Sequence, residues 1–194
     1  MRIQGRLLLA LFACAGSVPA ASAIDFTPRY TDTMEDGVPF HRMYFTEGNN
    51  RIFFRPPVNW QVSGEPAAIH FSPKGLHLAQ VSFRSVSPED AAIPFDEKGI
   101  EKLRAIARSL LPSAFTNPEG QFEIVNPIIL QDWTSFEIGF GGQFYGIESR
   151  RSILFINLAP GRQLLISIDA ATADFEKLHK DAYRSLATWR EVRP

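Results

Sequence analysis

The alternation of apolar and polar side chains predicts strands along most of the chain. In an extended segment, side chains two positions apart point to the same side. Six apolar residues follow this alternation in three segments: Ile69, Phe71, Val81, Phe83, Phe136 and Ile138. We expect these six to share the sheet face that packs against the helices. Their polar neighbours then share the opposite face: His70, Gln80, Ser82, Arg84 and Glu137.

The first two of these segments form a predicted hairpin. A three-residue loop, Pro73-Lys74-Gly75, places Phe71 opposite His77 in this register. Glycine suits the third loop position because it adopts positive φ angles without steric cost. A four-residue loop would instead put apolar side chains on both faces, which a half-buried hairpin resists.

Two continuous apolar runs, residues 153–156 and 164–166, predict central strands that are covered on both faces. Pro160-Gly161 between them suits a type II turn. The glycines of residues 139–146 are expected in a flexible turn, since no helix follows to make a phosphate-binding loop. Shorter strands are expected at residues 52–54 and 128–130.

Two segments carry apolar residues at helical spacing. Residues 96–111 and 173–190 each present one apolar stripe, which is typical of amphipathic helices. Asp96 suits the N-terminus of the first helix, and Thr172 is the expected N-cap of the second. The predicted fold class is α+β, with a mostly antiparallel β-sheet of about six to eight strands packed against two main helices in an α/β sandwich.

Residues 1–23 have the pattern of a signal peptide. Arg2 and Arg6 precede a short apolar run, and Ala21-Ser22-Ala23 is a small-x-small cleavage site. We expect cleavage after Ala23 and export to the periplasm or the medium. The residues before Cys14 also resemble a lipobox, so an envelope lipoprotein tethered through Cys14 is an alternative.

Composition and charge exclude several classes of protein. The chain has 194 residues, of which 45% are hydrophobic, and a net charge of −1. This suffices for one folded core and lacks the Lys and Arg excess of a nucleic-acid-binding protein. We expect a flexible leader at residues 24–37, a single domain at residues 38–194 and no transmembrane helix in the mature chain. One cysteine and four histidines without metal-ligand spacing predict no disulfide framework, metal or cofactor.

The polar sheet face is the main candidate for binding. This face could bind a small polar ligand or a protein of the envelope. Its five residues are His70, Gln80, Ser82 and Arg84 on the hairpin, and Glu137. The alternative is the solvated side of an ordinary antiparallel sheet. Phe144 and Tyr145 beside the glycine-rich turn are candidate aromatic anchors for a partner. By alternation, Arg150 and Arg151 point to opposite faces.

The sequence predicts no catalytic residue. It contains no Gly-x-Ser-x-Gly elbow, and His179, between Lys177 and Lys180, is expected on a solvated helix face. The alternative is a hydrolase on the open sheet face. It would use His70 or His77 with a serine and a carboxylate that converge in the fold.

The order of predicted elements resembles a known superfamily. An aromatic strand leads into Arg55-Pro56-Pro57-Val58-Asn59-Trp60, and a strand followed directly by an amphipathic helix closes the chain. Over residues 45–190 this resembles the PsbP-like/Mog1 α/β/α sandwich superfamily of small exported or lipid-anchored bacterial proteins. The resemblance implies a scaffold for binding and assembly without a shared catalytic centre. The leading hypothesis is an exported, non-enzymatic binding or accessory domain of the bacterial cell envelope.

Overall fold

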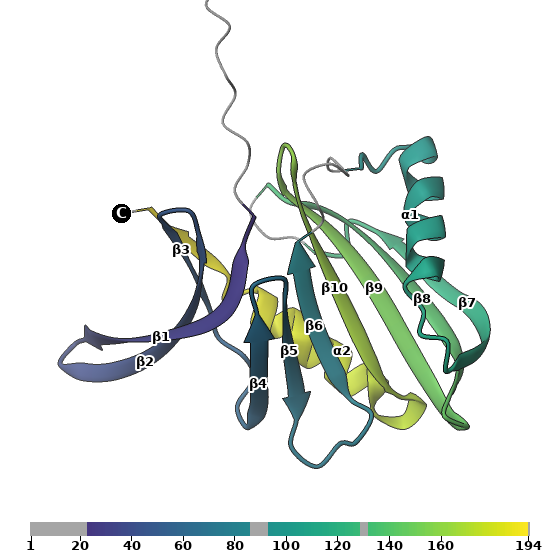
Figure 1. The fold of residues 1–194 in the computed structure, drawn as a ribbon, viewed down its shortest axis with the longest axis horizontal. Coiled ribbons are helices and arrows are strands. Elements are labelled where there is room, and N and C mark those ends of the chain that lie inside the picture. Colours follow the sequence, from purple (N-terminus) through teal and green to yellow (C-terminus); the bar gives the residue numbers. More distant parts are fainter. Residues whose placement is uncertain (1–22, 86–92, 129–131, 194) are drawn as a thin grey trace, which may run out of the picture.

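The computed structural model describes residues 23–85, 93–128 and 132–193. The predicted signal peptide up to Ser22, Cys14 with it, and residues 129–130 of one predicted strand lie outside the described residues. The described chain forms two antiparallel sheets and two helices, which confirms the α+β class (Figure 1). None of its helices is long and apolar enough to cross a membrane.

The larger sheet has seven strands, and the two continuous apolar runs form its centre. Its order is β4 (Trp60–Glu65), β5 (Ala68–Pro73), β6 (Gln80–Ser85), β10 (Arg162–Ala171), β9 (Ile147–Ala159), β8 (Thr134–Phe144) and β7 (Phe115–Val125). Residues 153–156 of β9 and 164–166 of β10 are buried, as their pattern predicts. Gly161 in the turn between them has a φ of +76°, which glycine tolerates.

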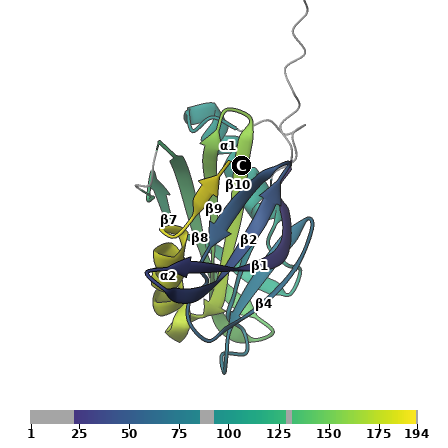
Figure 2. The ribbon, with the colours of Figure 1, turned by 90° about the vertical axis from the view of Figure 1, so that its left-hand side faces the viewer.

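The smaller sheet has four strands and includes the predicted leader. Its order is β1 (Asp25–Glu35), β2 (Val38–Glu47), β3 (Asn50–Phe54) and β11 (Arg190–Val192). A leader without regular structure over residues 24–37 is therefore wrong, because β1 pairs with β2 and Phe26 is fully buried. Hydrogen bonds to β2 fix β1 in the sheet. The sequence of β1 does not predict a strand, because its apolar and polar residues do not alternate clearly. The hairpin β1–β2 extends from the end of the molecule remote from α1 (Figure 1, Figure 2).

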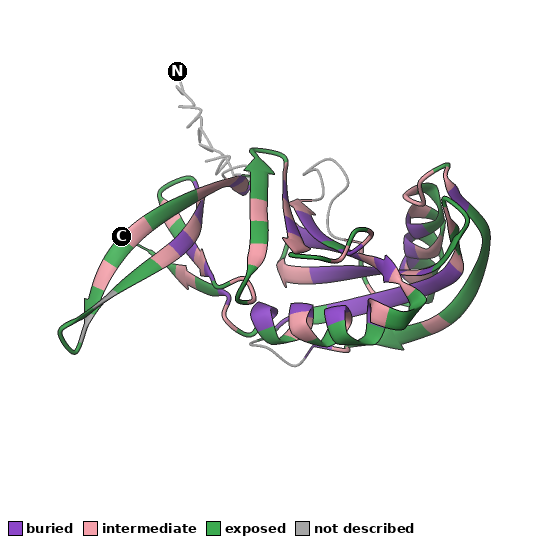
Figure 3. Ribbon diagram, turned by 90° about the horizontal axis from the view of Figure 1, so that it is seen from below, coloured by how far each residue is buried: buried purple, intermediate pink, exposed green. Residues whose placement is uncertain are grey.

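The two helices, α1 (Glu97–Ser109) and α2 (Thr172–Leu186), lie on opposite faces of the seven-stranded sheet (Figure 3). The prediction that one face packs against both helices is therefore wrong. Alternation shows which residues share a face, but it does not show which element covers that face. Asp96 caps α1 by accepting a hydrogen bond from the Gly99 amide at 2.7 Å, whereas Ala171, not Thr172, precedes α2.

Each helix covers its own apolar cluster, and the clusters define the α2 face and the α1 face of the sheet. The α2 face carries Ile69, Phe71, Val81, Phe83, Leu154 and Ile166 against α2 and the smaller sheet. There the ring centroids of Phe54, Phe83 and Trp189 lie 5.1–6.4 Å apart. The α1 face carries Phe136, Ile138, Phe140, Ile153, Phe155 and Leu165 against Leu103 and Ala107 of α1. Phe136 and Ile138 are thus separated from the other four alternating residues.

The hairpin of β5 and β6 keeps the predicted faces but has a different register. Phe71 pairs with Val81 and Ile69 with Phe83, whereas a three-residue loop would have set Phe71 opposite His77. The connection spans residues 74–79, with Gly75 at a φ of +86°. Because the register moves by an even number of residues, every side chain stays on its predicted face.

The glycine-rich segment is mostly strand. The turn from β8 to β9 contains Tyr145 and Gly146, both at positive φ, so a flexible turn over residues 139–146 is wrong for the part up to Phe144. At Gly139, a Cβ would come within 2.2 Å of the Phe122 ring. Glycine here leaves room for a side chain of the neighbouring strand.

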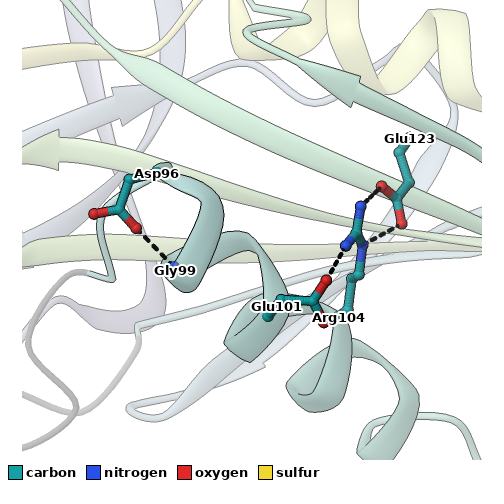
Figure 4. A network of polar contacts seen from close by, with 5 residues as sticks. All are labelled: Asp96, Gly99, Glu101, Arg104 and Glu123. Atoms are coloured by element: carbon teal, nitrogen blue, oxygen red, sulfur yellow. Dashed lines mark hydrogen bonds and ion pairs between the residues drawn. The ribbon is translucent and has the colours of Figure 1, made fainter.

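An ion-pair network fixes α1 over the β7–β8 half of the sheet. Arg104 of α1 donates to both carboxylate oxygens of Glu123 on β7, at 2.8 and 2.7 Å, and also contacts Glu101 (Figure 4). Paired hydrogen bonds of this kind fix the geometry as well as the charge. The α1 helix packs on β8, and its apolar cluster reaches β10 at Leu165. Among the described residues it leaves the part of the α1 face around Gln80 on β6 and Asp169 on β10 uncovered.

Candidate ligand-binding cavity

A cavity of about 680 Å³ opens on the uncovered part of the α1 face. Its floor consists of side chains from β5, β6, β10 and β9: His70, Gln80, Ser82, Arg84, Asp169 and Arg151. Cross-strand pairing places them together, because residues directly opposite in a ladder project from the same face. His70 pairs with Ser82, Gln80 with Asp169, and Asp169 with Arg151.

Two walls rise at the sides of this floor. Residues 73–79, which are the last residue of β5 and the long connection to β6, form one wall. Pro112 and Phe115, which follow α1, form the other wall together with Phe144 at the end of β8. The extra length of the first connection and the position of α1 over β8 thus turn an open sheet face into a concave site.

Most of the predicted binding residues meet in this cavity. His70, Gln80, Ser82, Arg84 and Phe144 line it. Tyr145 is exposed outside the lining, with its ring centroid 4.6 Å from that of Phe144. Glu137 is absent from the cavity because it lies on the α2 face, opposite Leu154.

The charged centre of the cavity is a pair that the sequence argument missed. Nη1 of Arg151 lies 3.0 Å from Oδ1 of Asp169, and the two side chains are 9% and 26% exposed. Burial raises the pKa of the Asp169 carboxyl to about 6, although the charges of Arg151 and Arg84 oppose this change. Burial also lowers the pKa of Arg151. A charged residue three positions after the apolar run 164–166, in the same strand, was the available signal, because charges are rarely buried without a partner.

Positive charge exceeds negative charge around the cavity. The basic lining residues are Lys74, Arg84, Arg150 and Arg151, and Asp169 is the one carboxylate among the lining residues that the structure describes. Arg150 belongs mainly to the α2 side, where it contacts Glu176 at 2.8 Å. Arg150 and Arg151 therefore divide between the two faces, as alternation predicts. Arg84 makes no hydrogen bond or salt bridge within the described ranges, so its guanidinium donors are available.

The cavity floor also contains polar atoms without a hydrogen-bond partner in the part of the chain that the structure describes. Nδ1 of His70 and Nε of Arg151 are buried without a hydrogen-bond partner among the described residues. Buried polar groups in native proteins nearly always have a partner, supplied by protein, water or ligand. A Ser-His-acid site requires a carboxylate that accepts a hydrogen bond from Nδ1 of its histidine. Nδ1 of His70 makes no such contact among the described residues.

The α2 face holds a second polar cluster, around Glu137. This carboxylate is fully buried, and it contacts Nε2 of His179 at 2.7 Å and the Tyr183 hydroxyl at 2.5 Å. Burial, together with the charge of Glu137, raises the pKa of Tyr183. Glu137 as part of the open polar patch is therefore wrong, and so is His179 on a solvated helix face. Both carboxylate oxygens have partners, so the cluster ties α2 to β8.

Comparison with known proteins gives structural neighbours of low similarity. No protein-family model matches the chain, and no curated protein matches it. Among the described residues, no group of three or more metal-ligating side chains converges. The solved structures that are similar include PA94, a Pseudomonas aeruginosa protein of unknown function. It is 13% identical with a TM-score of 0.45, and the match covers 86% of this chain and 99% of that one.

Two further structures are similar to the same degree. LpqN of Mycobacterium tuberculosis, described as involved in cell envelope biogenesis, is 13% identical with a TM-score of 0.46, covering 86% of this chain and 92% of its own. Cyanobacterial PsbP from Synechocystis sp. PCC 6803 is 8% identical with a TM-score of 0.43, covering 93% and 98%. The neighbours thus include a PsbP, from the superfamily that the sequence resembles. At these scores they support no conclusion about ligand or partner.

Proposed function

We propose that the protein is a non-enzymatic binding protein of the bacterial cell envelope that holds a small anionic ligand in the cavity on the α1 face. The observation that carries the proposal is the convergence of Arg84 and Arg151 on the floor of a concave site, beside Asp169, the one carboxylate among the described lining residues. Concave sites of roughly 300–1,000 Å³ are typical for small ligands. Export rests on the signal-peptide pattern of residues 1–23.

Arginine is suited to this role because its planar donors match carboxylate and phosphate oxygens. Asp169 neutralises Arg151, so the charge available to a ligand comes chiefly from Arg84, with Lys74 at the rim. A ligand oxygen that accepts from Arg84 would give this guanidinium a hydrogen-bond partner, which it does not have among the described residues. It would also add a negative charge to a site with an excess of positive charge.

The test measures affinity by titration calorimetry with acetate, succinate and inorganic phosphate. At least one of these anions should bind, and Arg84→Gln should weaken its binding about ten- to a hundred-fold, the value of one or two charge-assisted hydrogen bonds. Arg190→Gln, an exposed arginine on β11 outside the cavity, is the matched control and should leave affinity unchanged. Binding of none of the anions, or equal losses in both variants, would contradict the proposal.

A separate measurement tests whether the protein is exported in soluble form or tethered to the envelope by a lipid. Mass spectrometry of the mature N-terminus distinguishes the two forms that the sequence allows. A free N-terminus at Ile24 identifies a soluble exported protein, and a diacylated Cys14 identifies a lipoprotein. A mature protein that begins at Met1 would refute export by either route.

A further inference from the structure

The walls of the cavity differ in chemistry from its floor. The floor is polar and charged, whereas the walls present Leu76 and Leu78 on one side and Pro112, Phe115 and Phe144 on the other. Phe115 and Phe144 are directly paired across β7 and β8, so their side chains project from the same face of the sheet and together supply the apolar part of this wall. A ligand that satisfied only the floor would leave these apolar side chains in contact with water.

We propose that the ligand is an amphiphile, with a carboxylate or phosphate head on Arg84 and an apolar body between these walls. This inference rests on the proposed function, since the charged head is what the floor recognises. The sheet order supports the arrangement: β6, β10 and β9 carry the head-group residues, and they lie between β5, where one wall starts, and β8, where the other ends. Apolar groups of a ligand gain affinity in proportion to the apolar surface removed from water.

The positions of the wall residues show that the protein core does not already use all of them. Leu78 is half-buried and belongs to neither apolar cluster, while Phe144 is half-buried at the edge of the α1 cluster. Half-buried apolar side chains that line a concave site are the usual lining of a small-molecule pocket. Tyr145, next to Phe144 but outside the lining, provides a natural comparison for its role.

The experiment measures affinity along a series of straight-chain carboxylates, from butanoate to decanoate, below their micelle concentrations. Affinity should rise about two- to four-fold for each added methylene that becomes buried. Phe144→Ala and, independently, Leu78→Asn should flatten this rise, with little effect on butanoate. Tyr145→Asn is the matched control, because asparagine tolerates the positive φ of this turn position, and it should leave the rise unchanged. A parallel series of alkyl phosphates tells which head group is preferred.

The outcomes separate the two proposals. If butanoate and decanoate bind equally well and Arg84→Gln weakens both, the anion site stands and the amphiphile is refuted. If affinity rises with chain length but Arg84→Gln has no effect, the anion site is refuted and the amphiphile with it. A thermal melt of each variant identifies loss of binding through unfolding, and Leu78→Asn, outside both clusters, keeps the test decisive if Phe144→Ala does not fold.

Discussion

The two faces of the seven-stranded sheet differ in how they hold their buried carboxylates, Glu137 and Asp169. On the α2 face, Glu137 is fully buried and both of its oxygens have partners on α2. On the α1 face, Arg151 and Asp169 pair across neighbouring strands, but Nε of Arg151 and Nδ1 of His70 have no partner within the described residues. The carboxylate under α2 is satisfied within the protein, whereas the floor of the cavity presents polar atoms that a ligand can satisfy. Single buried atoms without a partner among the described residues also occur on the α2 side, at Nε of Arg150 and Nε1 of Trp189.

The two faces differ because the elements packed on them cover different fractions of the sheet. The α2 helix and the smaller sheet together cover the α2 face from β5 to β9. The α1 helix, held to β7 by Arg104 and Glu123, covers the other face only over β8 and its neighbours. The same sheet therefore has a packed core on one side and, on the other, the cavity for which we propose ligand binding.

Removal of Glu137 should have the largest effect on stability. Glu137→Ala leaves the His179 imidazole and the Tyr183 hydroxyl without their shared acceptor under α2, so we expect a loss of about 2–4 kcal/mol. Chemical denaturation measures it. Glu148→Ala, an exposed carboxylate on the neighbouring strand, should change stability by less than about 0.5 kcal/mol. Similar losses in the two variants would show that the buried cluster is not a tie between helix and sheet.

Asp169 should make the stability of the folded protein depend on pH. Its folded-state pKa is raised from 3.8 to about 6, so the folded protein holds this proton more tightly than the unfolded chain does. Stability from this group is therefore highest at low pH and falls as pH rises from about 4 to about 6, by on the order of 1–3 kcal/mol. The stability difference between the wild type and Asp169→Asn, measured across this range, isolates the contribution. A difference that stays constant with pH would contradict it.

Replacement of both members of the ion pair in the cavity, Arg151 and Asp169, should have the smallest effect on stability. Buried ion pairs can often be exchanged for apolar residues of similar volume at little cost. The double variant Arg151→Met with Asp169→Leu should therefore stay within about 1 kcal/mol of the wild type, although Arg151→Met alone should be less stable because it leaves Asp169 unpaired. A large loss in the double variant would show that this pair, like Glu137, is needed for the fold.

The hairpin of β5 and β6 shows how far pattern alone could predict the site. Alternation placed His70, Gln80, Ser82 and Arg84 on one face, and the structure keeps them there even though the register differs. It could not place Glu137, because the face of a strand is known only relative to its neighbours until the pairing is known. Nor could it pair Asp169 with Arg151, because these two residues are adjacent only through the pairing of β9 with β10.

The sequence by itself determined the elements and their local geometry: the central apolar strands, the two amphipathic helices, the sharing of faces within a hairpin, and the turn at Gly161. These depend on side-chain periodicity and on backbone angles, which are properties of neighbouring residues. The tertiary structure alone decided that the helices lie on opposite faces, that residues 25–35 join a sheet, and that a long connection and a half-covered face enclose a cavity. Those outcomes depend on contacts between distant segments, and periodicity contains no information about distance across the fold.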